Sequence, residues 1–306
     1  FSASLMNSSE ITKLLTDTTE KLSQTATIKK LYHRHRHCDA IPSGQVLSEV
    51  VDLCRAVLFP GYYGKSTINA ETMLYTIGVN VERLFDLLHR QVEAALCFSD
   101  EEQCSRCLDD IDRCATEMTA KLIERLPEIR ELLASDVEAA YLGDPAAESY
   151  AEVISCYPVI KALSNYRIAH ALYEIGVPLL PRILTEMAHS ETGIDIHPGA
   201  QIGRGFMIDH GTGVVIGATC VIGNNVKLYQ GVTLGARSFP LDEDGNPIKR
   251  IPRHPILEDN VIVYSNATIL GRIIIGKGAV IGGNIWITDD VPAGAQISQK
   301  KHTTLK

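Results

Sequence analysis

Two histidines in the second half of the sequence stand beside charged residues. His210 follows Asp209, and His254 follows Arg253. A neutral imidazole can take a proton from a hydroxyl group near neutral pH, and the fork of an arginine can bind both oxygens of a carboxylate. The two pairs therefore favour acid–base chemistry on a small charged molecule, although each histidine could instead have a purely structural role at a turn.

Three other clusters match binding motifs less well. The stretch 33–38 (HRHRHC) fits a solvated basic segment better than a metal site. Four cysteines follow the spacing of one helical face and predict buried thiols, because no second CxxC or histidine pair accompanies them. The glycines of residues 61–66 (GYYGKS) are too close together for a P-loop. We therefore predict no metal site; the four cysteines are Cys97, Cys104, Cys107 and Cys114.

The N-terminal two thirds of the chain have the pattern of helices. Apolar residues recur at helical spacing over residues 71–96, 129–142 and 150–175, with proline and glycine between these stretches. We expect an all-helical domain over residues 1–192. Residues 1–122 would form an extension, and residues 127–192 would lie next to the catalytic module.

A six-residue period begins after Thr192. Seven positions lie six apart from 196 to 232, and six more lie six apart from 257 to 287. Glycine usually follows three residues after each position of the first run. Each hexapeptide would form one short strand and one turn, and three would close a triangular coil of a parallel β-helix. The two runs are out of phase, so residues 236–255 must interrupt the repeat; the periodic residues are Ile196, Ile202, Ile208, Val214, Cys220, Val226, Val232, Leu257, Val263, Ile269, Ile275, Ile281 and Ile287.

Several segments in and around this repeat resemble a known family. Residues 195–210 (DIHPGAQIGRGFMIDH) closely resemble the signature of the serine O-acetyltransferases, as do residues 232–235 (VTLG) and 253–255 (RHP). Asp144-Pro145 resembles the family's upstream aspartate site. The resemblance covers residues 134–295 and implies acetyl transfer from acetyl-CoA to the hydroxyl of L-serine, the first step of cysteine biosynthesis from serine.

The resemblance also implies a fold and an assembly. An N-terminal helical domain would precede a left-handed parallel β-helix over residues 193–297 and a tail over residues 298–306. The β-helix would form a homotrimer, or a dimer of trimers, with active sites between subunits. L-cysteine is expected to inhibit, because it keeps the amino and carboxylate groups of serine.

Residue by residue, the resemblance assigns four kinds of role. His210 would be the general base and Asp195 the carboxylate that orients it. A buried carboxylate of this kind fixes the tautomer of the imidazole and stabilises the imidazolium. The serine amino group would be bound by Asp144 and Asp209, and the serine carboxylate by Arg253 and His254. The groove for acetyl-CoA would be lined by Gly235, Ala236, Ser265 and Gly283.

Two segments depart from the compact members of the family. Residues 237–251 (RSFPLDEDGNPIKRI) form a longer loop, and the N-terminal extension is also long. Both features favour a longer-chain branch. Many members dock into cysteine synthase through a tail that ends in isoleucine, whereas this sequence ends in residues 303–306 (TTLK), so that partnership stays open.

The overall composition disfavours several classes of function. The net charge of −8 disfavours a protein that coats nucleic acid or an anionic membrane. The sequence contains no long apolar run and no signal-peptide pattern, so we expect a cytoplasmic location. Three alternatives stay open: an acyltransferase acting on an amino sugar or antibiotic, a non-catalytic scaffold, and a metal hydratase. The hydratase would use His197, His210 and His254 as ligands.

Overall fold

The computed structural model describes residues 7–24, 41–64, 68–99 and 108–299. The chain divides into two units, residues 1–39 and residues 40–306. The basic stretch 33–38 and the pair Cys104 and Cys107 lie outside the described residues, so the expectations for them are not addressed by the structure.

The first unit contains helix α1 (Ser8–Ser23). Its N-terminus has a capping box, in which Asn7 Oδ1 accepts from the Glu10 backbone N–H at 3.0 Å and Glu10 accepts from the Asn7 N–H at 2.8 Å. No residue of α1 is buried, and Ile11 and Leu14 are about half exposed. Local capping, rather than packing, therefore defines this helix.

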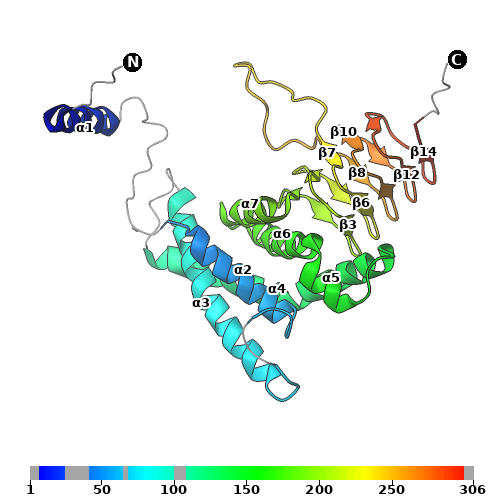
Figure 1. Cartoon of the computed structure of the whole chain (residues 1–306), viewed down its shortest axis with the longest axis horizontal. Helices are drawn as coiled ribbons and strands as arrows, with labels where there is room; N and C mark the ends of the chain where they lie inside the picture. The colour runs from blue at the N-terminus through cyan, green and yellow to red at the C-terminus, as the bar shows by residue number, and fades with distance from the viewer. Residues whose placement is uncertain (1–6, 25–40, 65–67, 100–107, 300–306) are drawn as a thin grey trace. The chain divides into compact units, whose positions relative to one another are not determined.

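Helices make up the N-terminal part of the second unit (Figure 1). The helix predicted over 71–96 is confirmed, with Leu84, Leu88 and Val92 fully buried. The stretch 150–175 is instead divided in two, because Tyr157 precedes a proline and is held in extended geometry at φ −78° and ψ 122°. The helices are α2 (Gly44–Leu58), α3 (Met73–Ser99), α4 (Leu108–Gly143), α5 (Tyr150–Cys156), α6 (Pro158–Ile175) and α7 (Leu180–Thr192).

Helix α4 runs through the region in which the sequence suggested a division of the helical part. It continues past Pro127 without ending, although proline removes a backbone donor from the helix. It packs against α2, α3, α5 and α6. The division into an extension over residues 1–122 and a part over residues 127–192 stays a prediction, and one helix spans the suggested boundary.

A parallel β-helix of about five turns follows α7, which confirms the predicted class of fold (Figure 1). Its strands form three sheets, one for each side of the triangular coil. The first sheet contains β1 (Asp195–Ile196), β4 (Val215–Ile216), β7 (Thr233–Gly235), β10 (Thr268–Leu270) and β13 (Trp286–Ile287). The second contains β2 (Gln201–Ile202), β5 (Val221–Ile222), β8 (Ile256–Leu257) and β11 (Ile274–Ile275). The third contains β3 (Met207–Asp209), β6 (Lys227–Tyr229), β9 (Ile262–Val263), β12 (Val280–Ile281) and β14 (Gln296–Ile297).

The register of the strands shows an insertion that the sequence pattern hides. Ile216 pairs with Leu234, 18 residues further on, as three hexapeptides require. Ile196 pairs with Ile216, which is 20 residues further on. The additional residues lie between β3 and β4, in the corner His210–Gly213. The run from 196 to 232 is therefore not one register, because the chain changes phase at the corner that carries His210.

The β-helix core explains why the run looked continuous. Both the inward strand residue and the residue two positions before it are buried, as at Val214 and Ile216. Beyond the corner that adds two residues, the six-residue period therefore falls on Val214, two positions before the strand residue Ile216. The apolar pattern therefore continues unchanged across a shift in structure.

A buried ion pair joins the helices to the β-helix. The Arg167 guanidinium donates to both carboxylate oxygens of Asp136, at 2.7 and 2.9 Å, and also to the carbonyls of Ile202 and Gly203. Asp136 accepts a further bond of 3.0 Å from the Phe206 backbone N–H. Both charged side chains are at most 4 % exposed. This network fixes α4 and α6 against the first coil, next to the site described below.

The interruption of the repeat is a loop over residues 236–255, which projects from the β-helix after β7 (yellow in Figure 1). Its tip is closed by a bridge between Leu241 and Pro247, and residues 237–250 are exposed. The loop returns to the coil at Arg253 and His254. Among the described residues, none of the helices is long and apolar enough to cross a membrane.

Candidate active site

Asp209 and His210 lie where the third sheet turns into the first. His210 has a left-handed backbone, with φ of 57°, and its side chain is 75 % exposed. Asn266 and Asn284 have the same left-handed backbone at this corner of later coils, with φ of 57° and 56°, so the conformation belongs to the coil corner. His210 Nε2 lies 4.0 Å from Asp209 Oδ1. The two-residue insertion thus presents an accessible imidazole beside a carboxylate.

Asp144 is held close to this corner by the end of α4. Its Oδ2 accepts from the Tyr157 hydroxyl at 2.6 Å, and its Oδ1 accepts from the Ala146 N–H at 2.8 Å. The Tyr157 hydrogen bond, followed by the Ala146 bond and the nearby charges of Lys227 and His210, holds the pKa of Asp144 below its usual value. Asp144 is therefore a fixed carboxylate, and we call Asp144, Asp209 and His210 the acidic edge.

Close packing of α4 on the third sheet makes this approach possible. A Cβ on Gly143 would lie 2.4 Å from the sulfur of Met207. Lys227, on the neighbouring strand, donates to the Gly143 carbonyl. The end of the helix thus lies directly against Met207 and Lys227 of the sheet, which places Asp144 near the corner.

Arg253 and His254 lie at a different corner, where the first sheet turns into the second. The Arg253 guanidinium lies over the ring of Phe239, 5.5 Å from its centre, and its Nε is buried with no partner among the described residues. Burial, and then the charges of Arg253, His197 and Arg272, lower the pKa of His254 to about 4. We call Arg253 and His254 the basic edge; His254 is neutral there.

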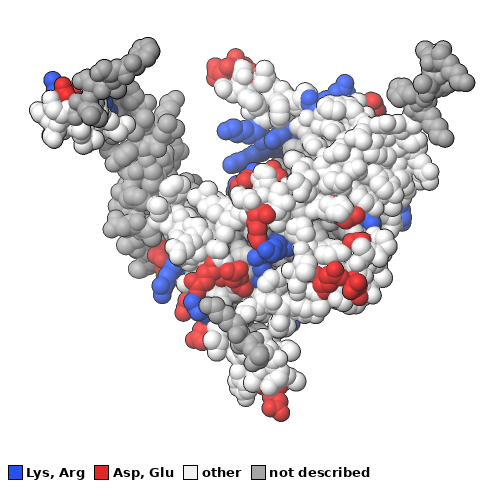
Figure 2. Space-filling view, in the orientation of Figure 1, with Lys and Arg blue, Asp and Glu red and all other residues white. Residues whose placement is uncertain are grey.

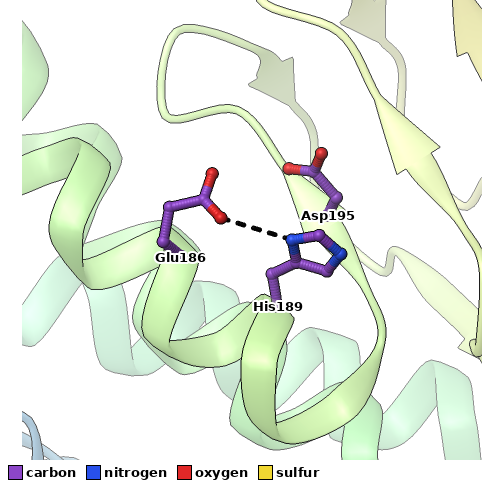
Figure 3. A group of neighbouring side chains, drawn as sticks. All are labelled: Glu186, His189 and Asp195. Carbon is purple, nitrogen blue, oxygen red and sulfur yellow. Dashed lines mark hydrogen bonds and ion pairs between the residues drawn. The ribbon is translucent and has the colours of Figure 1, made fainter.

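Asp195 lies on β1 beside α7, in an ionic cluster with Glu186 and His189 (Figure 3). His189 Nδ1 lies 3.3 Å from Glu186 Oε2. Arg182 pairs with Glu186 and lies 4.0 Å from Asp195, so a guanidinium already supplies positive charge to the two carboxylates. In the described part of the chain, Asp195 forms no ion pair with His210.

The structure separates the predicted site residues into two groups. Asp144, Asp209 and His210 lie together, and Arg253 and His254 lie together, but one side of the triangular coil stands between the groups. Charge interactions of His197 with both Asp195 and Arg253 associate Asp195 with the basic edge. Within one chain, the predicted site residues therefore form two separate groups.

The residues predicted for the acetyl-CoA groove divide in the same way. Ser265 and Gly283 lie on successive coils at the corner of the acidic edge, where a Cβ on Gly283 would be 3.0 Å from the Ser265 carbonyl oxygen. Gly235 ends β7, and Ala236 follows it at the basic edge. Each edge thus combines residues predicted for serine with residues predicted for acetyl-CoA.

The histidines of the metal hydratase alternative do not converge within one chain. His197 and His254 are near one another at the basic edge, whereas His210 is at the acidic edge. His197 Nδ1 accepts from the Gly199 N–H at 2.9 Å, within its own turn. This geometry suits a structural histidine.

Two residues of the site have no signal in the sequence pattern. Tyr157 reaches Asp144 because Pro158 ends the preceding helix, and an aromatic residue before proline could have suggested the break but not the contact. Thr219 bonds to His254 from a repeat corner at which many small residues would fit. Both were found only from the structure.

Comparisons with known proteins identify relatives over most of the chain. No family model matches. The chain is 51 % identical over 261 residues to a plasmid-encoded serine acetyltransferase of Synechococcus elongatus, covering 85 % of this chain and 82 % of the relative. Crystal structures of two Entamoeba histolytica serine acetyltransferases, one in complex with L-cysteine and one in complex with cysteine, are also similar. Isoform 1 is 35 % identical, with a TM-score of 0.71 and coverage of 87 % of this chain and 91 % of that one.

Isoform 3 extends the similarity to nearly the whole sequence. It is 34 % identical, with a TM-score of 0.69, and 96 % of each chain is covered. The helical part and the β-helix are both included in this match. The fold, the ordered motifs and the identity over most of both chains agree, and the chain belongs to the serine acetyltransferase family.

Proposed function

We propose that this chain transfers the acetyl group of acetyl-CoA to the hydroxyl of L-serine, in a site that two copies of the chain build together. The observation that carries the proposal is the separation of His210, which is 75 % exposed, from Arg253 and His254 at another corner. A base on an open surface lacks the enclosure that catalysis of this kind uses. A second copy would supply that enclosure.

The charges on the two edges match the two ends of an amino acid. The acidic edge offers the carboxylates of Asp144 and Asp209 to an ammonium group. The basic edge offers Arg253, whose buried Nε has no partner in the described residues, to a carboxylate. Serine is a zwitterion, so it would bridge the two edges with its hydroxyl beside His210.

In a ring of copies, each acidic edge would face the basic edge of a neighbouring copy. The acidic edge of one copy and the basic edge of the next are different surfaces, and a contact between different surfaces closes into a ring when the rotation allows it. The family resemblance implies that this ring is a trimer, or a dimer of trimers. In such a ring, Asp195 would orient His210 of a neighbouring copy, which explains why the two do not pair within one chain.

The reaction needs no covalent enzyme intermediate. The neutral His210 imidazole takes the proton of the serine hydroxyl as the oxygen attacks the thioester carbonyl. The tetrahedral intermediate then collapses, the carbon–sulfur bond breaks, and the imidazolium returns the proton to the CoA sulfur. Asp195 stabilises the imidazolium in between. The products are O-acetyl-L-serine and CoA, the first step of cysteine biosynthesis from serine.

Acetyl-CoA would lie along the coil between the same two edges. The coil is closely packed at both glycines, since a Cβ would lie 2.8 Å from Leu270 Cδ2 at Gly235 and 3.0 Å from the Ser265 carbonyl oxygen at Gly283. Their assignment to the groove for acetyl-CoA therefore rests on the family resemblance. Figure 2 shows basic side chains gathered between the loop after β7 and helix α7. Such charges suit the phosphate groups of CoA.

L-cysteine would inhibit at the same site. It keeps the ammonium and carboxylate groups that the two edges hold, and its thiol, with an ordinary pKa of about 8.5, gives up a proton to His210 more readily than a hydroxyl does. A thiolate–imidazolium pair would then form. We expect inhibition that is competitive with serine and weaker when His210 is replaced.

One assay tests the function. Thiol release from acetyl-CoA is measured with L-serine, L-homoserine and an amino sugar as acceptors. The proposal requires serine to be the preferred acceptor and the acetyl product to be O-acetyl-L-serine by mass spectrometry. A preference for the amino sugar would assign the chain to the other class of hexapeptide acyltransferase, and no release with any acceptor would overturn the proposal.

A further inference from the structure

The Thr219 hydroxyl ties a coil corner to the end of the projecting loop. Its Oγ1 accepts from the backbone N–H groups of Arg253 and His254, at 2.9 and 3.2 Å. It also lies 2.8 Å from His254 Nδ1. A hydroxyl has two acceptor lone pairs and one hydrogen. Since both lone pairs are used by the backbone, the hydrogen must point to Nδ1.

A second donor reaches the same ring nitrogen. The Thr219 backbone N–H donates to His254 Nδ1 at 3.1 Å. A backbone N–H can only donate, so Nδ1 cannot carry a proton. The neutral ring must hold its proton on Nε2. Across the described ranges, Nε2 makes no hydrogen bond, although His254 is only 7 % exposed.

The surroundings of the ring keep it in place and uncharged. The ring lies directly over Gly217, where a Cβ would be 2.0 Å from His254 Cδ2. Arg272 Nη1 donates to the carbonyls of both Thr219 and His254, at 2.6 and 3.1 Å. The charged or titratable groups that act on the ring are Arg253, His197 and Arg272, all of which disfavour a positive charge there.

We propose that Thr219 is a positioning residue that fixes His254 as an uncharged Nε2–H donor, directed with Arg253 toward the carboxylate of the bound amino acid. The proposal rests on the proposed function for the identity of that ligand. Arg253 supplies the positive charge, and His254 supplies a directed hydrogen bond. Thr219 holds both, because its one hydroxyl bonds to both backbones and to the ring.

Nuclear magnetic resonance of the protein without substrate tests the positioning directly. The chain is labelled with ¹⁵N-histidine, and His254→Gln assigns the His254 signals. The wild type should show a neutral ring protonated on Nε2 from about pH 8 to about pH 5.5, because its pKa is well below the ordinary value of about 6.5. A ring protonated on Nδ1, or one that titrates near its ordinary pKa, would overturn the proposal whether or not any variant folds.

Two variants of Thr219 separate the hydroxyl from the shape of the side chain. Thr219→Val keeps the branched shape and removes the hydroxyl, whereas Thr219→Ser keeps the hydroxyl and is the matched control. The His254 ring should titrate closer to its ordinary pKa in Thr219→Val and as in the wild type in Thr219→Ser. Equal titration in all three proteins would contradict the role of the hydroxyl.

Kinetics connect the positioning to the substrate. Thr219→Val should raise the KM for serine about tenfold, the effect of losing about one hydrogen bond, with kcat and the KM for acetyl-CoA little changed. Thr219→Ser should restore the serine KM. A parallel loss in all three constants would show a general structural role instead. If the wild type does not acetylate serine, the proposed function fails while the ring titration still decides the role of Thr219.

Discussion

The Tyr157 hydroxyl donates a 2.6 Å hydrogen bond to Asp144 Oδ2 across the junction of α4 and α6. Tyr157 is extended because Pro158 follows it, and this break in the helix directs the phenol to the carboxylate. The Ala146 N–H holds the other oxygen. The carboxylate proposed for the serine amino group is thus oriented before any substrate arrives.

Tyr157→Phe should weaken serine binding without affecting acetyl-CoA. Tyr157 lowers the pKa of Asp144, so the wild-type carboxylate stays ionised to a lower pH than that of the variant. At about pH 7 the Asp144 carboxylate is ionised in both proteins, so the variant loses only the hydrogen bond that orients it. We expect the KM for serine to rise about five- to tenfold, measured by initial rates, with kcat little changed. The rise should grow below about pH 5. An unchanged serine KM would remove Tyr157 from the site.

Replacing His210 should remove the base. His210→Ala is expected to lower kcat by about 10²- to 10⁴-fold, the usual contribution of general-base catalysis. His210 has φ of 57°, which asparagine tolerates better than alanine, so His210→Asn is the control for strain at the corner. Both variants should lose activity, and His210→Asn should also keep the thermal unfolding midpoint. Near wild-type turnover in His210→Asn would assign the proton transfer to another residue.

Arg253→Lys should separate the serine site from the acetyl-CoA site. Lysine keeps the charge but loses the fork that binds both oxygens of a carboxylate, and the Arg253 Nε is buried without a partner in the described residues. The KM for serine should rise about tenfold while the KM for acetyl-CoA stays nearly constant. If the acetyl-CoA constant changes instead, Arg253 belongs to the cofactor groove.

The repeat could be predicted from the sequence because its period is local: an inward residue recurs every six positions whatever lies elsewhere in the chain. The corner insertion at His210 could not, since Val214 and Ile216 are both buried and conceal the shift. Contacts between residues that lie far apart in the sequence could not be predicted either. Thr219 bonds to the backbone of Arg253 over 34 residues, and only the loop's path brings them together. The family resemblance implied an active site between subunits, but it did not show which residues share a corner of one chain and which lie apart.

The ion pair between Asp136 and Arg167 should dominate the stability of the junction. Asp136→Asn leaves a buried guanidinium without its counter-charge, and we expect a loss of about 3–5 kcal/mol in the free energy of unfolding, measured with urea. A double variant, Asp136→Leu with Arg167→Met, removes both charges and should be less unstable than Asp136→Asn. A change below about 0.5 kcal/mol in Asp136→Asn would show that the pair contributes little.

Mixing two variants with complementary defects tests the shared site most directly. His210→Asn chains retain an intact basic edge, and Arg253→Ala chains retain an intact acidic edge. The two are denatured, mixed in equal amounts, refolded together and assayed for thiol release with serine. If each site takes His210 from one copy and Arg253 from the next, random assembly should restore about one quarter of wild-type activity. A mixture no more active than the separate variants, although mass spectrometry shows mixed trimers, would contradict the account.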